Sequence, residues 1–205
     1  MKYNKDVRHQ WNDLLFKTID VKGKSFIDIG TFDGETCEIA RQKGAASVLG
    51  VDYIVNDHLR DSDIDVLPLD IFSEKWLYLP KFDVVSCQGV FYHVPDVISL
   101  FSRLRMITGQ VMFLEGHIST KPGCFMEFRG ETINTQNSNW WTPTEECLHK
   151  MLNICGFNSK TLGRDGNRIG VLCVPGNVDL RDILPRKMRN MGLTLTDDVI
   201  VGDGL

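Results

Sequence analysis

The sequence predicts an α/β protein whose mostly parallel sheet is covered by helices on both faces. Strand and helix signals alternate along most of the chain, an order typical of parallel sheets. The last two strand candidates are separated only by turn-forming residues, which predicts an antiparallel hairpin at the C-terminal end. The 205 residues, of which 42% are hydrophobic and 24% charged, are enough for one well-packed domain.

The predicted strands are short apolar runs, several of them rich in β-branched residues. The first, residues 25–29, ends at a glycine, and the helix that follows it ends before Gly44, a suitable C-cap. Four further strands of this kind are expected at residues 47–52, 65–69, 82–87 and 110–115. The final hairpin combines strands at 158–162 and 168–174 with a turn-rich segment between them.

Two further helices are expected from apolar spacing and cap residues. Residues 96–107 carry apolar side chains at helical spacing, with Gly109 just beyond the predicted end. The run Thr142-Pro143-Thr144-Glu145 has the form of a capping box with proline at the first helical position. It predicts a helix that begins there and stops near Gly156.

Two segments lie outside this alternation. Residues 116–141 have little periodicity and are longer than the usual connection of ~4–6 residues, which favours a lid or a substrate loop. Residues 176–205 follow the last strand. We therefore expect a folded domain over residues 1–175 and a C-terminal extension over 176–205, to which the sequence assigns no task.

Composition narrows the class of function. The formal net charge of −4 excludes a chain-wide basic field for holding nucleic acid. Residues 1–11 carry no apolar core of a signal peptide, and no apolar run approaches the ~20 residues that cross a bilayer. The six cysteines show neither Cys-x-x-Cys pairs nor zinc-finger spacing. These features predict a cytoplasmic protein without a metal site or a membrane partner.

The strongest motif is Ile-Asp-Ile-Gly-Thr-Phe-Asp-Gly at residues 27–34, between a strand and a helix. Glycines there let a ligand approach the carboxyl edge of a parallel sheet. A dinucleotide site requires Gly-x-Gly-x-x-Gly, whereas this chain has Phe32 where the middle glycine would stand. Asp28 and Asp33 would repel phosphates but suit a cationic ligand. Asp52, at the end of the second strand, could accept hydrogen bonds from a ribose in either cofactor class.

These residues and several later ones resemble class I S-adenosylmethionine-dependent methyltransferases. The resemblance includes the motif above, Val-Asp at 51–52, Leu-Asp-Ile at 69–71 and Phe-Asp-Val-Val at 82–85. The longer segment 82–96, with Gly-Val-Phe-Tyr-His-Val-Pro at its centre, is similar to the branch that forms carboxymethyl and methoxy groups on the tRNA wobble uridine. The resemblance covers residues 22–174. It implies a Rossmann-like seven-stranded methyltransferase sheet, mostly parallel with an antiparallel hairpin at the C-terminal end.

The resemblance also implies a cofactor, S-adenosyl-L-methionine, and roles for individual residues. Gly30 and Gly34 would leave room for its methionine part and ribose, and Asp28 would organise the loop or bind the amino group. Asp52 would hold the ribose hydroxyls. The remaining cofactor-binding residues that it implies are Phe32, Asp33, Tyr53, Asp70 and Ile71 around the adenosine, and Gln88 and Gly89 beside the sulfonium.

For catalysis we expect mainly in-line positioning of an acceptor and exclusion of water. His93 is the first candidate for a general base, because the ordinary pKa of histidine lies near neutrality, and a structural role is about equally plausible. His117 and Glu115 are the next candidates. Tyr92, Trp140 and Trp141 are expected to contact the acceptor, with one tryptophan in the core and one on the cleft. His9, His58 and His149 are expected at the surface.

Charge and length favour a small-molecule acceptor over tRNA. The chain is acidic and has only about 24 residues before its first strand, whereas the resembling tRNA enzyme carries a large N-terminal region. The alternatives are a tRNA-modifying methyl or carboxymethyl transferase and a catalytically inactive cofactor-binding subunit. A nicotinamide-dependent oxidoreductase is disfavoured by Phe32. The sequence predicts neither the atom methylated nor the oligomeric state.

Overall fold

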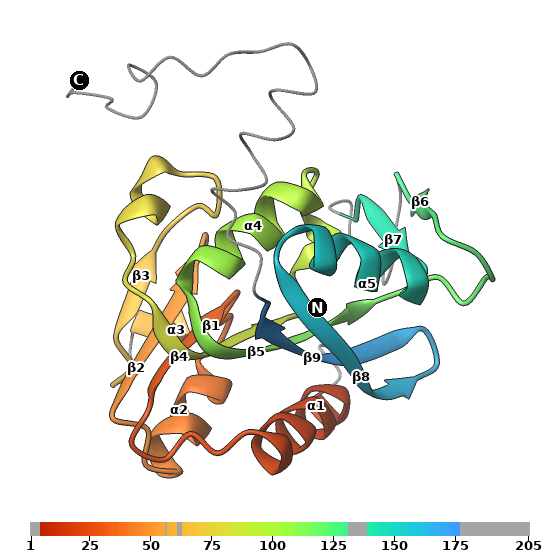
Figure 1. Ribbon diagram of the computed structural model, residues 1–205. Helices are drawn as coiled ribbons and strands as arrows, with labels where there is room; N and C mark the ends of the chain where they lie inside the picture. The colour runs from red at the N-terminus through yellow and green to blue at the C-terminus, as the bar shows by residue number, and fades with distance from the viewer. Residues whose placement is uncertain (1–4, 56, 61–62, 131–138, 177–205) are drawn as a thin grey trace.

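The computed structural model contains a seven-stranded sheet between two layers of helices (Figure 1). It describes residues 5–55, 57–60, 63–130 and 139–176, so the predicted extension after residue 176 lies outside the described residues. The strands of the sheet are β1 (Ser25–Ile29), β2 (Ser47–Asp52), β3 (Val66–Pro68), β4 (Phe82–Gln88), β5 (Thr108–His117), β8 (Phe157–Asp165) and β9 (Arg168–Pro175). The helices are α1 (Lys5–Thr18), α2 (Glu35–Gln42), α3 (Asp57–Arg60), α4 (Val97–Ile107) and α5 (Glu145–Ile154), with 3-10 turns η1 (Glu74–Tyr78) and η2 (Phe91–His93).

The strand order β3-β2-β1-β4-β5-β9-β8 confirms the predicted sheet. The first five strands in this order are parallel, and β9 pairs antiparallel with both β5 and β8. The chain crosses over between β1 and β4, where the direction of winding reverses. In such sheets a crevice opens at the carboxyl ends of the two central strands, so this edge is where a ligand is expected.

The two faces of the sheet bury different side chains because side chains alternate along a strand. In β4, Val85 packs with Leu100 of α4 and Leu148 of α5 in the larger core. The neighbouring Val84 packs on the opposite face with Trp11 of α1. Figure 1 shows α4 and α5 above the sheet and α1 and α2 below it.

Helix α1 was not predicted. Trp11, Leu15 and Ile19 are buried at intervals of four residues, which places them on one helical face toward the sheet. Glycines in the C-terminal hairpin allow the close approach, since a Cβ atom at Gly170 would lie 2.8 Å from Cζ3 of Trp11. Charged residues between these positions obscure the pattern in the sequence, and Asn12 of α1 contacts Gln88 at the carboxyl edge of the sheet.

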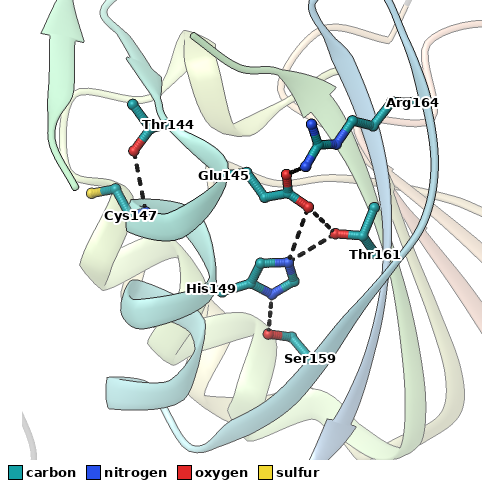
Figure 2. Close-up of polar contacts among 7 residues, drawn as sticks. All are labelled: Thr144, Glu145, Cys147, His149, Ser159, Thr161 and Arg164. Atoms are coloured by element: carbon teal, nitrogen blue, oxygen red, sulfur yellow. Dashed lines mark hydrogen bonds and ion pairs between the residues drawn. The ribbon is translucent and has the colours of Figure 1, made fainter. Parts of the chain in front are cut away.

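The predicted start of α5 is wrong. Residues Trp141–Pro143 form strand β7, which pairs with β6 (Met126–Phe128) in a small second sheet. The helix begins two residues later than expected, where the Thr144 hydroxyl accepts a hydrogen bond from the Cys147 amide at 3.3 Å (Figure 2). The same pairing places strand β6 inside segment 116–141, for which only a loop was expected.

His149 was predicted at the surface, and its side chain is half-buried. Figure 2 shows its ring between α5 and β8, with Nδ1 2.7 Å from the Ser159 hydroxyl and Nε2 2.9 Å from the Thr161 hydroxyl. Thr161 donates in turn to Glu145 at 2.5 Å, and Arg164 forms an ion pair with that carboxylate. Burial lowers the pKa of His149. This chain of contacts fastens α5 to the hairpin.

In the part of the chain that the structure describes, no helix is long and apolar enough to span a membrane.

Candidate functional site

The turn after β1 lies at the carboxyl edge and has an unusual backbone. Gly30, Phe32 and Gly34 have φ angles of 75°, 54° and 82°, all in the left-handed region. Glycine adopts this region without cost, but Phe32 is held there. Its amide donates to Asp52 Oδ2 at 2.9 Å, while its side chain is 43% exposed. The turn is therefore tied to the end of β2.

Asp52 is fixed in one orientation by backbone amides. Oδ2 accepts from Phe32, and Oδ1 accepts from Ile54 at 3.0 Å. Each carboxylate oxygen has further acceptor capacity, and the side chain is only half-buried. The Asp52 carboxylate can therefore accept two more donors from the solvent side. Tyr53, which was predicted to line the same site, is 74% exposed beside it.

Asp70 and Ile71 lie next along the edge, just after β3. The Asp70 carboxylate is exposed and accepts from the Phe72 amide at 2.7 Å. The Leu69 amide donates to the Asp52 carbonyl at 3.0 Å, which joins this segment to β2. Ile71 packs against the larger core. The structure thus brings both residues to the same edge as Asp52.

The N-terminus of α2 is acidic. Its N-cap, Gly34, provides no side-chain cap, Glu35 and Glu38 occupy the first turn, and Asp33 accepts from the Glu35 amide at 3.2 Å. Asp28 lies 2% exposed within β1. A pyrophosphate prefers a helix N-terminus without such negative charge. The local charge and the Phe32 side chain therefore both disfavour a dinucleotide here.

Gln88, at the end of β4, contacts a residue that sequence reasoning missed. Its Nε2 donates to Oδ1 of Asn12 in α1 at 3.0 Å and to the Ser86 hydroxyl at 3.2 Å. Asn12 is 2% exposed. Gly89 follows with φ 73°, and its amide donates to the Glu115 carbonyl at 3.0 Å. Helix α1 therefore supplies part of the site.

A buried polar group lies at the end of β5 and the start of β9. It consists of Glu115 and His117, which were predicted as candidates, and Arg168, which was not. Arg168 donates from Nε and Nη2 to the two carboxylate oxygens of Glu115, at 2.6 Å each. Its Nη1 lies 3.0 Å from Nε2 of His117. Glu115 is 1% exposed. Arg168 was not predicted, because it comes from a strand 53 residues away from Glu115 in the sequence.

The contact with Arg168 fixes the proton on His117. A guanidinium can only donate, so Nε2 of His117 accepts and Nδ1 carries the hydrogen. Burial, aided by the positive charges of Arg168 and His93, lowers the pKa of His117 to about 4. Nδ1 is buried, and a side-chain contact of His117 with Asn167 partly opposes this lowering of the pKa. Near neutral pH this ring is an uncharged hydrogen-bond donor.

Burial also shifts the pKa values of the ion pair itself. It raises the pKa of the Glu115 carboxyl, and the bonds from Arg168 oppose that shift. For Arg168, burial alone would lower the pKa, but contact with Glu115 more than offsets it and the pKa is raised. The guanidinium therefore stays charged.

Tyr92 and His93 complete this group from η2. The Tyr92 ring is 4.8 Å from the His117 ring and 4.3 Å from the His93 ring, measured between centroids. His93 is half-buried, so it is less enclosed than His117. The three residues predicted as candidates for catalysis, His93, His117 and Glu115, are thus brought together by the fold.

The two tryptophans lie near η2, where Trp141 begins β7 of the small sheet and Trp140 precedes it. The Trp140 amide donates to the Tyr92 carbonyl at 2.8 Å, and its side chain is 42% exposed. The Trp141 indole donates to the Pro95 carbonyl at 2.9 Å and packs against the larger core. Phe128 of β6 lies next to both rings. One tryptophan is therefore packed inward, and the other is available on the surface near Tyr92.

Comparisons with known proteins identify the family of this chain. Residues 3–159 match the model of a family described as a methyltransferase domain. The chain is 28% identical over 161 residues to a tRNA U34 carboxymethyltransferase of Colwellia psychrerythraea, covering 73% of this chain and 49% of that protein. It is 32% identical over 120 residues to a ubiquinone biosynthesis O-methyltransferase of Stutzerimonas stutzeri, covering 51% of each.

The fold of this chain is also similar to that of a solved methyltransferase structure. The S-adenosylmethionine dependent methyltransferase from Mesorhizobium loti superposes with a TM-score of 0.66 at 18% identity, covering 80% of this chain and 97% of that one. The chain spans about half the length of the curated relatives it matches. Since the family model covers most of the described sheet, this chain belongs to the methyltransferase domain family.

Proposed function

We propose that the chain is an S-adenosylmethionine-dependent methyltransferase that transfers a methyl group to an oxygen or nitrogen of a small-molecule acceptor. The observation that carries this proposal is the Asp52 carboxylate, held by the amides of Phe32 and Ile54 beside the left-handed Gly30–Gly34 turn. A carboxylate in this position can accept from two ribose hydroxyls, and the acidic start of α2 tolerates a cation where it would repel phosphate.

The remaining residues of the edge would hold the rest of the cofactor. Asp70 would accept from the adenine amino group and the Ile71 amide would donate to a ring nitrogen, because both follow β3 next to Asp52. Gln88 ends β4 and Gly89 follows it. Because β4 lies on the other side of β1 from β2 and β3, these two residues would lie at the methionine end of the cofactor. The cofactor supplies a methyl group on a sulfonium, which is already a strong electrophile.

Among the candidate bases, the geometry favours His93. His117 accepts from Arg168, and its pKa of about 4 makes it a weak base at neutral pH. Both oxygens of Glu115 are engaged by Arg168. His93 is adjacent, less enclosed and able to take a proton from the acceptor on a ring nitrogen. The buried His117 would then support the site rather than remove the acceptor's proton.

A small-molecule acceptor is supported by the net charge of −4 and by the acidic start of α2, which weaken attraction to an RNA backbone. A tRNA acceptor is the second candidate, because the Colwellia psychrerythraea relative is named for tRNA U34. An inactive cofactor-binding subunit is the third, and it would bind the cofactor without turnover.

The proposal can be tested in two steps. Calorimetric titration should show micromolar binding of S-adenosylmethionine and S-adenosylhomocysteine and no binding of NADH, which serves as a control. Transfer of a labelled methyl group would then be measured with pools of small metabolites and with unmodified tRNA. Label in tRNA alone would replace the small-molecule acceptor with tRNA. Failure to bind either adenosyl compound would overturn the cofactor assignment.

A further inference from the structure

Two of the six cysteines are accessible to solvent. Cys124 is exposed and Cys147 is half-buried, whereas the other four are buried (Cys37, Cys87, Cys155 and Cys173). Burial raises the pKa of the Cys87 and Cys173 thiols, and such thiols react slowly because the thiolate is the reactive form. Thiol chemistry of the folded chain is therefore confined to Cys124 and Cys147.

The backbone brings these two cysteines together. Phe125, which follows Cys124, pairs with Thr144 just beyond the β6–β7 ladder, and the Thr144 amide donates to the Phe125 carbonyl at 3.0 Å. The Thr144 hydroxyl accepts from the Phe125 amide at 3.4 Å and from the Cys147 amide at 3.3 Å. One oxygen atom therefore holds both segments. Figure 2 shows the Cys147 sulfur pointing away from His149.

The two thiols also affect each other's proton affinity. Burial first, and then the charge of the Cys124 thiol and a hydrogen bond with it, raises the pKa of Cys147 to about 11. One turn further along α5, Lys150 forms an ion pair with Glu146 at 2.6 Å, and Glu146 and then Cys124 raise the pKa of its ammonium group. The Cys124 sulfur therefore lies beside a second thiol and near a positive charge, which favours its thiolate.

We propose that Cys124 and Cys147 form a redox-active pair that a low-molecular-weight disulfide, such as oxidised glutathione, converts into an internal disulfide. The Cys124 thiolate attacks one sulfur of the oxidant, so one glutathione thiolate leaves and Cys124 holds the other half as a mixed disulfide. Cys147 then loses its proton to water and attacks the Cys124 sulfur, which releases the second glutathione. The two cysteines lose two electrons, and the oxidant is reduced to two thiols.

The surroundings of each thiol determine the order of the two attacks. Cys124 reacts first because it is exposed and lies near Lys150. Its conversion to a mixed disulfide removes the charge that helps to raise the pKa of Cys147, which frees the second thiol for attack. The product closes a loop that contains β6 and β7, and the Trp140 amide just before β7 is bonded to Tyr92 of η2. Oxidation therefore fixes the small sheet to α5 beside two residues that were expected to contact the acceptor.

The test is equilibration of the full chain with glutathione buffers of several ratios, stopped with acid and an alkylating agent and followed by mass spectrometry of peptides. The wild-type chain should form a disulfide between Cys124 and Cys147. In denaturing urea the effective concentration of one thiol for the other is on the order of 1 mM, and the folded chain should exceed it at least about tenfold. In Cys147→Ser, Cys124 should instead retain glutathione.

Lys150→Met should slow the reaction of Cys124 with oxidised glutathione about threefold, because the thiolate loses a nearby cation. The matched control, Lys17→Met, removes an exposed lysine from α1 on the opposite face of the sheet and should keep the wild-type rate. A wild-type chain that keeps glutathione on Cys124 and a free thiol on Cys147 would overturn the inference, and so would an effective concentration no higher than in urea. These readouts do not depend on cofactor binding, so their failure would leave the proposed function intact.

Discussion

Replacing Arg168 with methionine should strongly destabilise the protein at pH 8. The substitution removes both hydrogen bonds to Glu115, each 2.6 Å long, and leaves a carboxylate that is 1% exposed without its cation. Loss of one partner of a buried ion pair costs about 3–5 kcal/mol. The Arg168 side chain is 17% exposed, so water can partly replace it, and we expect a loss near the lower limit.

The matched control is the double variant Glu115→Gln/Arg168→Met, which lacks both charges. It should lose only about 1–2 kcal/mol relative to wild type, because an unpaired amide is less costly to bury than an unpaired carboxylate. Urea denaturation followed by circular dichroism gives the free energy of unfolding for wild type and both variants. The comparison isolates the buried charge from the loss of side-chain packing.

The pH dependence gives a second check with a defined sign. Without Arg168, burial raises the pKa of Glu115 in the folded protein above its unfolded value, so the folded state favours the protonated carboxyl. The single variant should therefore approach the stability of the double variant at low pH and fall behind as pH rises through the folded pKa of Glu115. A loss in Arg168→Met below about 1 kcal/mol at pH 8, or a gap that widens toward low pH, would refute the reasoning.

Three other variants test individual residues. Asp52→Ala should weaken S-adenosylmethionine binding by about 1.5–3 kcal/mol in calorimetry, and unchanged affinity would contradict its ribose role. His93→Ala should spare cofactor binding but lower turnover on an identified acceptor by about 10²–10⁴, whereas wild-type turnover would leave only a structural role. In His117→Gln, the free energy of unfolding should depend less on pH below pH 6.5 than it does in wild type. Because the pKa of His117 is lowered from 6.5 to about 4, the neutral ring stabilises the fold above pH 6.5, and that stability is lost as pH falls toward 4. Between pH 8 and 5 wild type should therefore lose about 2 kcal/mol more than the variant, and parallel unfolding curves would exclude this.

The sheet was predictable because its signals are local. Each central strand is a short apolar run. Gly30 follows β1, Asp52 ends β2 and Asp70 comes shortly after β3, so these residues stand at fixed places relative to those runs. In a parallel sheet the carboxyl ends of neighbouring strands meet at one edge, so positions in the sequence translate directly into positions in the crevice.

The capping prediction failed where a long-range contact overrode a local one. Thr142 and Thr144 both precede plausible helix starts, and the sequence alone favours the one followed by proline. In the fold, Pro143 pairs with Met126 of β6, and its carbonyl accepts from the Ser119 amide. Those contacts extend the strand to Pro143 and leave the cap to Thr144. No residue between 142 and 145 indicates this pairing, because its partner strand lies earlier in the chain.

Arg168 and Asn12 show why supporting residues are harder to predict than contacting ones. Each acts across the sheet or between layers: Arg168 reaches Glu115 from the antiparallel hairpin, and Asn12 reaches Gln88 from a helix 76 residues earlier. Neither stands in a motif. Yet they determine the chemical state of residues that do, since Arg168 fixes the tautomer of His117 and Asn12 fixes the orientation of the Gln88 amide. A variant of Arg168 should therefore change the proton affinity of His117, whereas a variant of Asp52 should weaken both adenosyl ligands together.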